Sequence, residues 1–593
     1  MPTLLHDHHP RPLLARPAWE DLSGQWQFAY DDDDIGLAEH WQRRADVFDR
    51  TITVPYPPES PASGIGDTGY HPVLWYRRTI TVEPPEPGRR VMLRFGAVDY
   101  RADVWVNGEH VAFHEGGQTP FAADITDALT ADGPQVLVVR AWDDPHDLEQ
   151  PRGKQDWQED PHVIWYERTS GIWQPVWLEE LPGEHVEQLR WTPLPSAGEV
   201  ELEARLARRS SGPLRVTVRL ELDGRLLAEE TSLVNGSLLR RRIRVEDVTY
   251  QAEPHPLEWS PEQPTLCQAT IIVHGREGVA DDVVHSYVGF RTAGADSRSF
   301  LLNGRPYFLR LALSQGYWPQ SHLAAPDQDA LRAEVELIKQ LGFNGIRVHQ
   351  KAEDPRFLYW CDRLGLLVWA DAAASYSFSG RSLARTTREW IEIVERDAGH
   401  PCVVAWVAFN ESWGVPGVAH SATEREAVRA TFHLLKALDP SRPAIGNDGW
   451  EYVSGDLLGV HDYTHDPRAI RDRYGDGDRV RETVTDGRPG GRRLTLDRDM
   501  PAVPVVLSEF GGITYAPDRP ATWAGYGAAD SPENLLEQLS ALLGAVHASS
   551  GLAGFCYTQL TDTGQERNGL LTEDRKPKAD PALIAAIIRG ETD

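Results

Sequence analysis

Beyond residue 300, amphipathic helical patterns alternate with short apolar runs, and this alternation restricts the fold more than any other feature of the chain. Gly342 can end the first of these helices, whose apolar face is formed by Leu331, Val335, Ile338 and Leu341. The apolar run 343–349 follows at once and has the length of a buried strand. Parallel strands need a crossover between them, so the repeated unit predicts a parallel sheet covered by helices.

The number of these units indicates a barrel. Apolar runs recur over about 290 residues, which is the size and rhythm of a (β/α)8 barrel. The predicted strands are 307–313, 343–349, 366–369, 403–409, 444–445, 457–463, 503–509 and 554–560. Residues 295–593 are assigned to this barrel. Asp354, which precedes a proline, predicts one helix start, and Thr423 with Glu426 forms a capping-box pair at another. Segment 471–500, rich in Gly, Arg and Asp, is predicted to be a long loop.

Before residue 295 the pattern is that of two β domains. Residues 1–183 contain short strand patterns separated by turn signals such as Asn107-Gly108, which is typical of an all-β sandwich. Residues 184–294 include the alternating run 214–222, which leads into the turn Asp223-Gly224. The strand patterns run from Val186 to Thr292, and this length of about 105 residues is that of an immunoglobulin-like sandwich.

The C-terminal ends of the predicted barrel strands collect polar side chains. In a (β/α)8 barrel this end carries the active site, because all the strands open onto one mouth. The predicted register places there His349, Glu411, Tyr463, Glu509 and Gln559. Periodicity alone therefore predicts that these side chains share one site.

Two glutamates in that set suit the hydrolysis of a glycosidic bond. Glu411 follows the run 403–409, and Glu509 ends the run 503–509. A pair of carboxyl groups is the minimum equipment for this reaction, and their separation decides between retention and inversion. The sequence does not supply that separation. A capping or ion-paired structural role is the alternative for either glutamate on its own.

Neighbouring residues indicate distinct roles for the two carboxyl groups. Arg347, near the end of the second strand, would keep Glu509 ionised. Glu411 would then donate the proton, because a nearby anion raises its affinity for that proton. Asn410 offers an amide donor to a sugar hydroxyl. The alternatives are a structural salt bridge for Arg347 and a structural hydrogen bond for Asn410.

Composition argues against several other classes of function. A net charge of −29 disfavours nucleic acid or an anionic membrane as a partner. The four cysteines show no CxxC spacing, so we expect a reducing, cytoplasmic location without disulfides or a zinc site. We also expect neither a membrane span nor a secretion signal, because no apolar stretch is long enough. The polar segment His6 to His9 is expected to be a disordered tail.

Longer motifs surround both glutamates. Residues 400–414 read HPCVVAWVAFNESWG, and residues 505–512 read VVLSEFGG. Further motifs lie at 70–82, 106–117, 168–173 and 257–264. In this order they resemble glycoside hydrolase family 2, the family of β-galactosidases, β-glucuronidases and β-mannosidases, over nearly the whole chain. The resemblance implies an N-terminal β jelly-roll sandwich, an immunoglobulin-like β-sandwich and a C-terminal (β/α)8 TIM barrel.

The resemblance also implies a role for each matching residue. Glu411 would be the acid/base residue and Glu509 the nucleophile of a retaining mechanism with a covalent glycosyl-enzyme. Asn410 would contact the sugar 2-hydroxyl, and Arg347 and Tyr463 would support the nucleophile. Further sugar contacts would come from His349, Trp413, Asp156, Gln559 and Arg567. The alternative for His349 is a structural histidine, and the alternative for Asp156 is a place on an exposed acidic loop.

Departures from the family pattern leave the sugar open. Glucuronidases of the family grip the sugar carboxylate with an Asn-x-Lys pair, but Arg567-Asn568-Gly569-Leu570 lacks the lysine, although Arg567 could supply a cation. Residues 371–376 lack the Glu-x-His metal pair of the large β-galactosidases, so we expect no metal and no cofactor. The eighth strand lacks the tryptophan common there, so Tyr557 or Gln559 would shape the floor of an altered pocket.

These observations lead us to expect a retaining exo-β-glycosidase acting on a small-molecule or oligosaccharide glycoside. A β-galactosidase-like substrate is slightly favoured over a glucuronide, galacturonide, mannoside or furanoside. An α-L-arabinosidase with the same two carboxylates is one alternative. A non-catalytic carbohydrate-binding protein is another, although loss of a glutamate would be its mark and neither is lost. Members of the family often associate through their β domains, so a homo-oligomer is compatible with the sequence.

Overall fold

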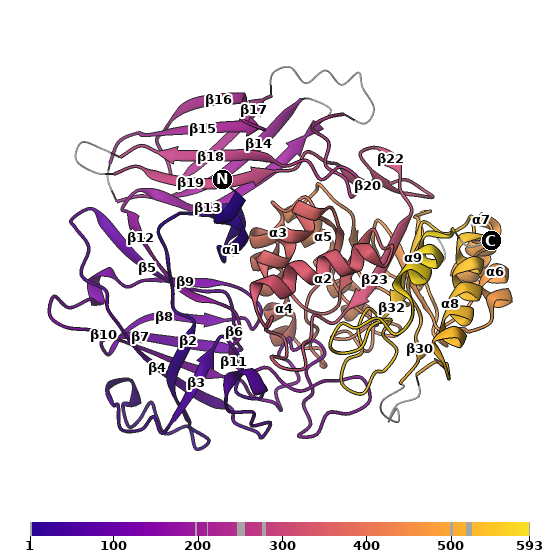
Figure 1. Cartoon of the computed structure of the whole chain (residues 1–593), viewed down its shortest axis with the longest axis horizontal. Coiled ribbons are helices and arrows are strands. Elements are labelled where there is room, and N and C mark those ends of the chain that lie inside the picture. Colours follow the sequence, from indigo (N-terminus) through magenta and orange to yellow (C-terminus); the bar gives the residue numbers. More distant parts are fainter. Residues whose placement is uncertain are drawn as a thin grey trace.

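The computed structural model describes residues 3–195, 198–209, 211–245, 255–275, 280–497, 502–516 and 525–591. Three parts follow one another along the chain (Figure 1). Two β-sandwiches, the first in indigo and purple and the second in magenta, lie beside a helix-covered barrel drawn in rose-red through orange to yellow. The predicted multidomain architecture with a C-terminal barrel is confirmed.

The first sandwich consists of two antiparallel sheets with a common apolar core. Their strand orders are β1-β12-β5-β9 and β3-β2-β4-β10-β7-β8, and β11 pairs with β6 beside them. The strands are β1 (Glu20–Asp21), β2 (Gly24–Tyr30), β3 (Arg50–Val54), β4 (Val73–Ile80), β5 (Arg89–Phe95), β6 (Val98–Asp99), β7 (Arg101–Val106), β8 (Glu109–Glu115), β9 (Phe121–Asp124), β10 (Gln135–Trp142), β11 (Gly171–Ile172) and β12 (Val176–Pro182). Leu74 and Tyr76 of one sheet and Leu93 and Phe95 of the other belong to this core, as the two-residue period of a strand requires.

The second sandwich has sheets of strand order β13-β14-β17 and β16-β15-β18-β19. Its strands are β13 (His185–Leu194), β14 (Glu199–Ala207), β15 (Leu214–Leu222), β16 (Arg225–Val234), β17 (Leu238–Arg244), β18 (Cys267–Val273) and β19 (Asp282–Val288). The alternation predicted for 214–222 is confirmed, because Leu214, Val216, Val218 and Leu220 are buried in the core.

The barrel begins after a small sheet of β20 (Ala293–Ala295), β21 (Phe300–Leu302) and β22 (Arg305–Pro306). A strand occurs in each of the eight predicted segments: β23 (Leu309–Ser314), β24 (Gly345–Val348), β25 (Leu367–Asp371), β26 (Val403–Val407), β27 (Ala444–Ile445), β28 (Leu458–Asp462), β29 (Val505–Gly511) and β32 (Gly554–Thr558). They form one parallel sheet of order β27-β26-β25-β24-β23-β32-β29-β28. The first strand thus lies beside the last, and the sheet curves into a nearly closed barrel.

Helices cover the outside of the barrel strands. They are α2 (Gln328–Gln340), α3 (Pro355–Leu364), α4 (Gly380–Asp397), α5 (Ala422–Leu438), α6 (Pro467–Tyr474), α7 (Gly477–Asp486), α8 (Pro532–His547) and α9 (Pro581–Arg589). The start predicted at Asp354 is confirmed, since its side chain accepts a hydrogen bond from the backbone of Arg356. The start predicted at Thr423 is wrong, because Ser421 caps α5 by accepting from the N–H of Glu424.

The predicted long loop 471–500 is wrong over its first half. The second half of α6 and all of α7 lie between residues 471 and 486, and both helices begin at an aspartate N-cap, Asp466 and Asp476. Their buried faces are short, and charged residues surround them, so the helical period is weak in the sequence. Residues 498–500 lie outside the described residues.

The expected disordered tail at His6 to His9 is also wrong. Helix α1 (Thr3–His8) contacts α3 of the barrel, and the chain then passes beside the second sandwich (Figure 1). His6 donates through Nδ1 to the carbonyl of Pro12 (2.8 Å), and His9 is fully buried. The buried side chains Leu13 and Leu14 anchor the segment, which outweighs the polarity of its histidines.

A loop of the first sandwich reaches the barrel. The backbone N–H groups of Arg152 and Gly153 donate to the carbonyl of Ala374 at 3.0 and 3.1 Å. In return, the N–H of Tyr376 donates to the carbonyl of Leu148 at 2.9 Å. Since residues 374–376 follow β25, the loop lies at the C-terminal end of the barrel strands.

Two remaining expectations from the sequence concern disulfides and membrane spans. All four cysteines are buried and carry free thiols. Within the described ranges, no helix has both the length and the apolar character needed to cross a membrane.

Candidate active site

The C-terminal ends of the barrel strands bring the two glutamates together. Glu509 lies within β29, and Glu411 follows the end of β26 at Val407. A carboxylate oxygen of Glu411 lies within 4.8 Å of one of Glu509. The Glu509 side chain is buried, whereas that of Glu411 is 17% exposed. The two carboxyl groups therefore face one shared space.

Arg347 of β24 contacts acidic and amide groups from several strands. Its Nη1 donates to Oε1 of Glu509 (3.1 Å) and lies 2.8 Å from Oδ2 of Asp448. Its Nη2 donates to Oδ2 of Asp371 (2.9 Å) and to Oδ1 of Asn410 (2.6 Å). Burial disfavours the charge, yet the surrounding carboxylates raise the pKa of Arg347. The guanidinium is therefore charged and fixes one oxygen of Glu509.

Tyr463 fixes the second oxygen of Glu509. Its hydroxyl donates to Oε2 at 2.5 Å, and its ring stacks on Tyr526 with centroids 3.6 Å apart. Tyr526 is about half exposed, so this ring pair extends from the buried glutamate to the surface. Donors on both oxygens hold the carboxylate in one plane, which a group that attacks a single carbon atom requires.

Glu411 is positioned by an unusual backbone conformation. Glu411 and Ser412 have φ values of 53° and 62°, in the left-handed region. This conformation costs about 1–3 kcal/mol in a residue other than glycine, so its surroundings must impose it. The Glu411 N–H donates to the carbonyl of Asp448 (3.0 Å), and the Ser412 N–H donates to Oδ1 of Asn447 (3.0 Å). Ser412 Oγ also donates to Oε2 of Glu451 (2.7 Å), so the turn after β26 is tied to the segment after β27.

His461 lies between the two glutamates, and it was not predicted from the sequence. The ring is fully buried on β28. Nδ1 is 2.7 Å from Oε1 of Glu411, and Nε2 is 3.2 Å from Oδ2 of Asp448 and 3.4 Å from Oε1 of Glu509. His461 precedes Tyr463 by two positions and shares its face of the strand, which is the one sequence signal that could have revealed it.

His461 changes the proton affinity of both glutamates. Burial opposes a charged imidazole, but the carboxylates of Glu509, Asp448 and Glu411 raise the pKa of His461 to about 10. Burial alone would raise the pKa of Glu411, yet the hydrogen bond from His461 holds it below its usual range. Burial raises the pKa of Glu509, and the charge of His461 opposes that rise. The structure thus differs from the expectation that Glu509 raises the proton affinity of Glu411, because an imidazolium lies between them.

The same three side chains have the spacing of a metal site, with ligand atoms of Glu411, His461 and Glu509 all within 4.8 Å of one another. Their chemistry does not fit a metal. Both ring nitrogens of His461 face carboxylates, which raise its pKa and favour a proton on each nitrogen, whereas a metal ligand needs a free lone pair. The guanidinium of Arg347 is 3.4 Å from Nε2 and would repel a cation. This set of groups suits a bound proton.

A row of amides holds His349. Its Nδ1 donates to Oε1 of Gln315 (3.0 Å), Gln315 donates to Oε1 of Gln559 (2.9 Å), and Gln559 donates to Oδ1 of Asn568 (2.8 Å). Burial lowers the pKa of His349 well below its usual range, so the ring is neutral. Among the described residues, its Nε2 has no hydrogen-bond partner and lies 3.8 Å from Oε1 of Glu509. Nε2 is therefore an acceptor available to a sugar hydroxyl.

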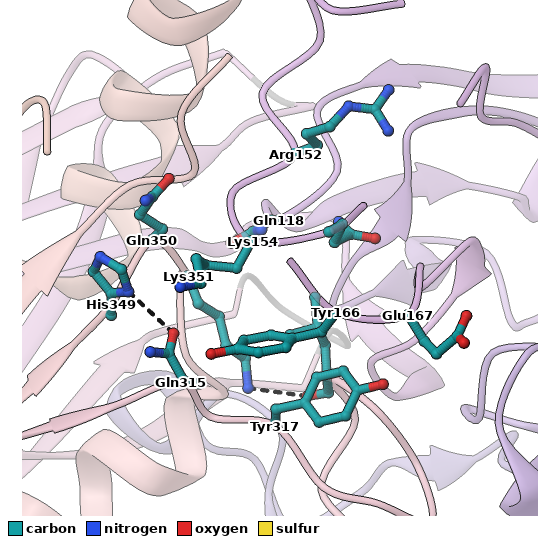
Figure 2. A pocket seen from close by; sticks show the side chains of 12 residues that line it. Gln118, Arg152, Lys154, Tyr166, Glu167, Gln315, Tyr317, His349, Gln350 and Lys351 are labelled. Carbon is teal, nitrogen blue, oxygen red and sulfur yellow. Dashed lines mark hydrogen bonds between the residues drawn. The ribbon is translucent and has the colours of Figure 1, made fainter. Parts of the chain in front are cut away.

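A pocket beside His349 is lined by both the barrel and the first sandwich. Figure 2 shows His349 and Gln315 on the barrel side, with Lys154 and Tyr166 of the sandwich loop opposite them. Lys154 Nζ is 3.3 Å from Oε2 of Glu566, and the Tyr166 hydroxyl donates to the same oxygen. Lys154, Tyr166 and Glu566 were not predicted as site residues, because the sequence does not reveal which part of the long loop meets the barrel.

Asp156 and Arg567, both predicted to contact the sugar, have partners close by in sequence. Oδ1 of Asp156 accepts from the N–H of Gln158 (2.9 Å), and Oδ2 accepts from the N–H of His162 and pairs with its Nδ1, each at 2.7 Å. Arg567 Nη1 lies 2.7 Å from Oε1 of Glu573. In the described part of the chain, neither side chain has a polar contact with the two glutamates of the barrel.

Trp413 belongs to an aromatic cluster between the sandwich loop and the barrel. Its ring meets Trp165 at 5.5 Å and Tyr376 at 5.1 Å, both edge-on. Trp157 lies 4.6 Å from Tyr376, and Trp165 Nε1 donates to the Tyr376 hydroxyl at 2.6 Å. Aromatic rings offer apolar surface with a polar edge, which suits the faces of sugars. The cluster lies beside Glu411, as Trp413 is two positions after it.

This arrangement can bring a proton and a nucleophile to one bond. Glu411 and His461 hold a proton, and Glu509 is a fixed carboxylate facing the same space. The predicted residues Asn410, Arg347, His349 and Tyr463 surround the pair, and Gln559 acts on it through the amide row. Asp371 and Asp448 complete the set, and each follows or ends a barrel strand, which is the signal that could have identified them.

Two models of one protein family match the chain. The model of the sugar binding domain of glycosyl hydrolases family 2 matches residues 19–182. The model of the TIM barrel domain of the same family matches residues 295–465. Together the two ranges cover more than half of the chain.

Known relatives match much of the chain in sequence or in fold. The β-glucuronidase of Canis lupus familiaris is 28% identical over 504 residues, which are 77% of this chain and 74% of that protein. A β-galactosidase of Thermoanaerobacter pseudethanolicus (strain ATCC 33223 / 39E) is 25% identical over 440 residues, which are 72% of this chain and 54% of that protein. The structure of a β-glucuronidase from an uncultured Clostridium sp. is similar in fold, with a TM-score of 0.76 at 20% identity over 97% of this chain and 98% of that one. The chain belongs to glycoside hydrolase family 2 and is an O-glycoside hydrolase.

Proposed function

We propose that this chain is a retaining exo-β-glycosidase that removes a terminal non-reducing sugar. The observation that carries the proposal is that carboxylate oxygens of Glu411 and Glu509 lie within 4.8 Å of each other. Retaining enzymes hold their carboxyl groups about 5–5.5 Å apart, whereas inverting enzymes leave about 6.5–9.5 Å for a water molecule. The short separation favours direct attack by a carboxylate.

In this proposal Glu509 is the nucleophile and Glu411 is the acid/base residue. Arg347 and Tyr463 hold both oxygens of Glu509, so the carboxylate is ready to attack the anomeric carbon. Glu411 assists the leaving group in the first step and takes a proton from water in the second. Asn410 accepts from Arg347 through Oδ1, so its amide nitrogen points away from the guanidinium and can donate to the 2-hydroxyl.

The sandwich loop supports action at a chain end. Its hydrogen bonds to Ala374 and Tyr376 close one side of the barrel mouth, and Lys154 and Tyr166 project from it into the pocket beside His349 (Figure 2). A pocket closed on one side accepts a terminal sugar more readily than the middle of a long chain.

For the sugar itself, we propose a neutral glycone, with a β-galactoside-like substrate favoured. Each of four cations in the described residues around this end of the barrel already has a carboxylate partner within 3.3 Å: Lys154 with Glu566, Lys351 with Glu353, Arg567 with Glu573, and Lys578 with Asp562. Arg152 also lines the pocket, but its Nη2 donates to the carbonyls of Asp144 and Asp147, and its guanidinium points away from His349 (Figure 2). A uronic acid bound at one of the four paired cations would have to displace the carboxylate partner, and a buried carboxylate without a cation is costly. Neutral hydroxyls need no such exchange.

A uronide is the second candidate. The similar proteins include β-glucuronidases, and a solved structure with a TM-score of 0.73 and 21% identity, covering 97% of this chain and 96% of that one, is a β-galacturonidase from Eisenbergiella tayi. Lys154 lines the pocket and would be the cation nearest a bound uronate. Binding would then require Glu566 to release it.

A panel of 4-nitrophenyl glycosides tests the proposal, with β-galactoside, β-glucoside, β-mannoside, β-glucuronide, β-galacturonide and α-L-arabinosides as substrates. We expect the neutral β-galactoside to be hydrolysed fastest and both Glu411→Gln and Glu509→Gln to lose activity. Glu389→Gln is the matched control, because burial raises the pKa of this glutamate to about 8 and its carboxyl group accepts from the N–H of Gly117 rather than contacting Glu411 or Glu509. Unchanged hydrolysis by Glu509→Gln would overturn the nucleophile assignment, and activity confined to uronides would overturn the neutral glycone.

A further inference from the structure

His461 links Glu411 to a second carboxylate behind it. Nδ1 lies 2.7 Å from Oε1 of Glu411, and Nε2 lies 3.2 Å from Oδ2 of Asp448. Asp448 is itself fixed, since Nη1 of Arg347 is 2.8 Å from Oδ2 and Ser508 Oγ donates to Oδ1 at 3.0 Å. His461 and Asp448 are both fully buried. The imidazole therefore cannot turn toward water and is held in line between the two carboxylates.

Two glycines leave room for this line of side chains. A Cβ on Gly449 would lie 2.6 Å from Nδ1 of His461, and a Cβ on Gly459 would overlap Oδ1 of Asp448. Gly449 also has a φ of +95°, which side chains rarely adopt. The backbone around His461 and Asp448 is thus built to admit the pair at close range.

We propose that His461, aligned by Asp448, shares one proton with Glu411, so that the two side chains together form the acid/base unit of the reaction. The inference rests on the proposed role of Glu411 as the acid/base residue. His461 has no access to the sugar and acts through Glu411, so it is a positioning residue that sets the charge of the unit.

The charges around the ring favour an extra proton on this unit. Glu411 approaches from the turn after β26, Asp448 from the segment after β27 and Glu509 from β29, while Arg347 of β24 is the facing cation at 3.4 Å. Directly after the strand of His461, Tyr463 is engaged with Glu509, and the ring nearest to that of His461 is Trp450, with centroids 5.6 Å apart. Neutral His349 adds no charge. Three carboxylates against one guanidinium hold the proton on the imidazole, in agreement with the raised pKa of His461 and the lowered pKa of Glu411.

Over the two steps of the reaction, the proton that leaves His461 is replaced by one from water. At rest, Nδ1 of His461 carries the proton and Glu411 is a carboxylate. As the bond from the anomeric carbon to the leaving group breaks, the leaving-group oxygen takes this proton by way of the Glu411 carboxyl group, and Glu509 bonds to the anomeric carbon. His461 is then neutral, with Nε2–H donating to Asp448. In the second step the hydroxyl of water bonds to the anomeric carbon, Glu509 leaves, and the proton of water returns to the unit.

The test is the pH profile of His461→Asn with two aryl glycosides of the sugar identified by the panel. One has a poor leaving group, 4-methylphenol, which needs a proton, and the other has 2,4-dinitrophenol, which leaves without one. For the poor leaving group, we expect kcat/KM to fall at least about 100-fold and its alkaline limb to move to lower pH by at least about one unit. For the dinitrophenyl glycoside, we expect a loss of less than about tenfold. Equal losses for both leaving groups, with an unmoved alkaline limb, would overturn the proposal.

His400→Asn is the matched control. His400 is buried and pairs with Asp362 at 2.6 Å, but it precedes β26, at the opposite end of the barrel. This variant should keep the wild-type alkaline limb. Should His461→Asn not fold, Asp448→Asn leaves the imidazole in place and is expected to move the limb in the same direction; an unmoved limb in that variant would overturn the proposal.

Glu411→Ala separates this inference from the proposed function. With the dinitrophenyl glycoside, this variant should accumulate glycosyl-enzyme, and added azide should restore turnover and give a β-glycosyl azide. If azide restores turnover in this way but the His461 variants keep the wild-type pH profile, the proposal that His461 shares a proton with Glu411 is wrong. The assignment of Glu411 as the acid/base residue then still stands. If Glu411→Ala hydrolyses the 4-methylphenyl glycoside normally, the acid/base assignment itself fails.

Discussion

Replacing Arg347 by lysine or by methionine separates the charge of this side chain from its shape. The guanidinium contacts three carboxylates and one amide through three nitrogens, and it is completely buried. Lysine keeps the charge but carries its donors on one atom, so it cannot reach Asp371, Asn410 and Glu509 together. Methionine removes both the charge and the donors at similar length.

The expected losses of stability follow from these contacts. A hydrogen bond to a charged group contributes about 1.5–3 kcal/mol, so Arg347→Lys, which loses at least one, should cost about 2–3 kcal/mol. Removing one partner of a buried ion pair costs about 3–5 kcal/mol, which is the range expected for Arg347→Met. Part of that cost is relieved as carboxyl groups bind protons, and Asp371, whose pKa burial already raises to about 6, should do so first.

Activity should fall for a different reason in each variant. In Arg347→Lys the charge near Glu509 remains, so kcat/KM should drop about 100-fold through misplacement of the carboxylate, with little change in its pH dependence. In Arg347→Met the pKa of Glu509 should rise, because the opposing cation is gone. The acid limb of kcat/KM should therefore move to higher pH by at least about one unit, equivalent to about 1.4 kcal/mol.

The assay is kcat/KM between pH 4 and 9, measured together with urea unfolding of each variant. Arg356→Met is the matched control. Arg356 is buried and donates to Asp354 (2.9 Å) at the start of α3, and it does not contact Glu509. It should lose stability but keep the wild-type acid limb. If Arg347→Met is folded and its acid limb coincides with that of the wild type, the reasoning that Arg347 controls the ionisation of Glu509 is refuted.

Three further results are expected. Tyr463→Phe removes the 2.5 Å bond to Oε2 of Glu509 and should lower the rate of glycosyl-enzyme formation about 10- to 100-fold in stopped-flow measurements; a wild-type rate would show that the hydroxyl has no part in that step. The pKa of His461 is raised from 6.5 to about 10, so its stabilising contribution is complete below pH 6.5 and disappears as the pH rises to about 10. The free energy of unfolding should therefore fall over this window by up to about 5 kcal/mol more in the wild type than in His461→Asn, and parallel urea-unfolding curves would contradict the assignment. Glu566→Gln frees Lys154 and should raise the ratio of kcat/KM for β-glucuronide to that for β-galactoside about tenfold, whereas an unchanged ratio would exclude Lys154 as a cation for uronates.

The order of strands and helices beyond residue 300 could be predicted because it depends on local patterns. Helix α3 starts at Asp354 and ends at Gly365 for local reasons. The aspartate side chain accepts a hydrogen bond from the first turn, and the glycine adopts a positive φ, so only adjacent residues are needed to predict both ends. The same reasoning placed Glu411 and Glu509 at strand ends, because all parallel strands of a barrel open to one side. Local reasoning failed at α6 and α7, where short apolar faces lie among charged residues.

The meeting of side chains from different strands could not be predicted in the same way. His461 lies in an apolar run and looks like part of a core strand, and its partner Glu411 is on another strand. The separation of the two carboxyl groups depends on the left-handed turn at Glu411 and Ser412, which bonds to Asn447, Asp448 and Glu451 impose. The pairing of Lys154 with Glu566 depends on where a loop of the first sandwich contacts the barrel. Each of these is a tertiary contact with no local pattern.

The central claim is that Glu509 forms a covalent bond to the sugar while Glu411 and His461 manage the proton. Its most direct test is inactivation with a 2,4-dinitrophenyl 2-deoxy-2-fluoro-β-glycoside of the preferred sugar, followed by mass spectrometry of the proteolysed enzyme. The account predicts one fluoroglycosyl group per chain, attached to Glu509, and no labelling in Glu509→Gln. A label on Glu411 would contradict the account. So would the release of a sugar with inverted anomeric configuration and no covalent label on the enzyme.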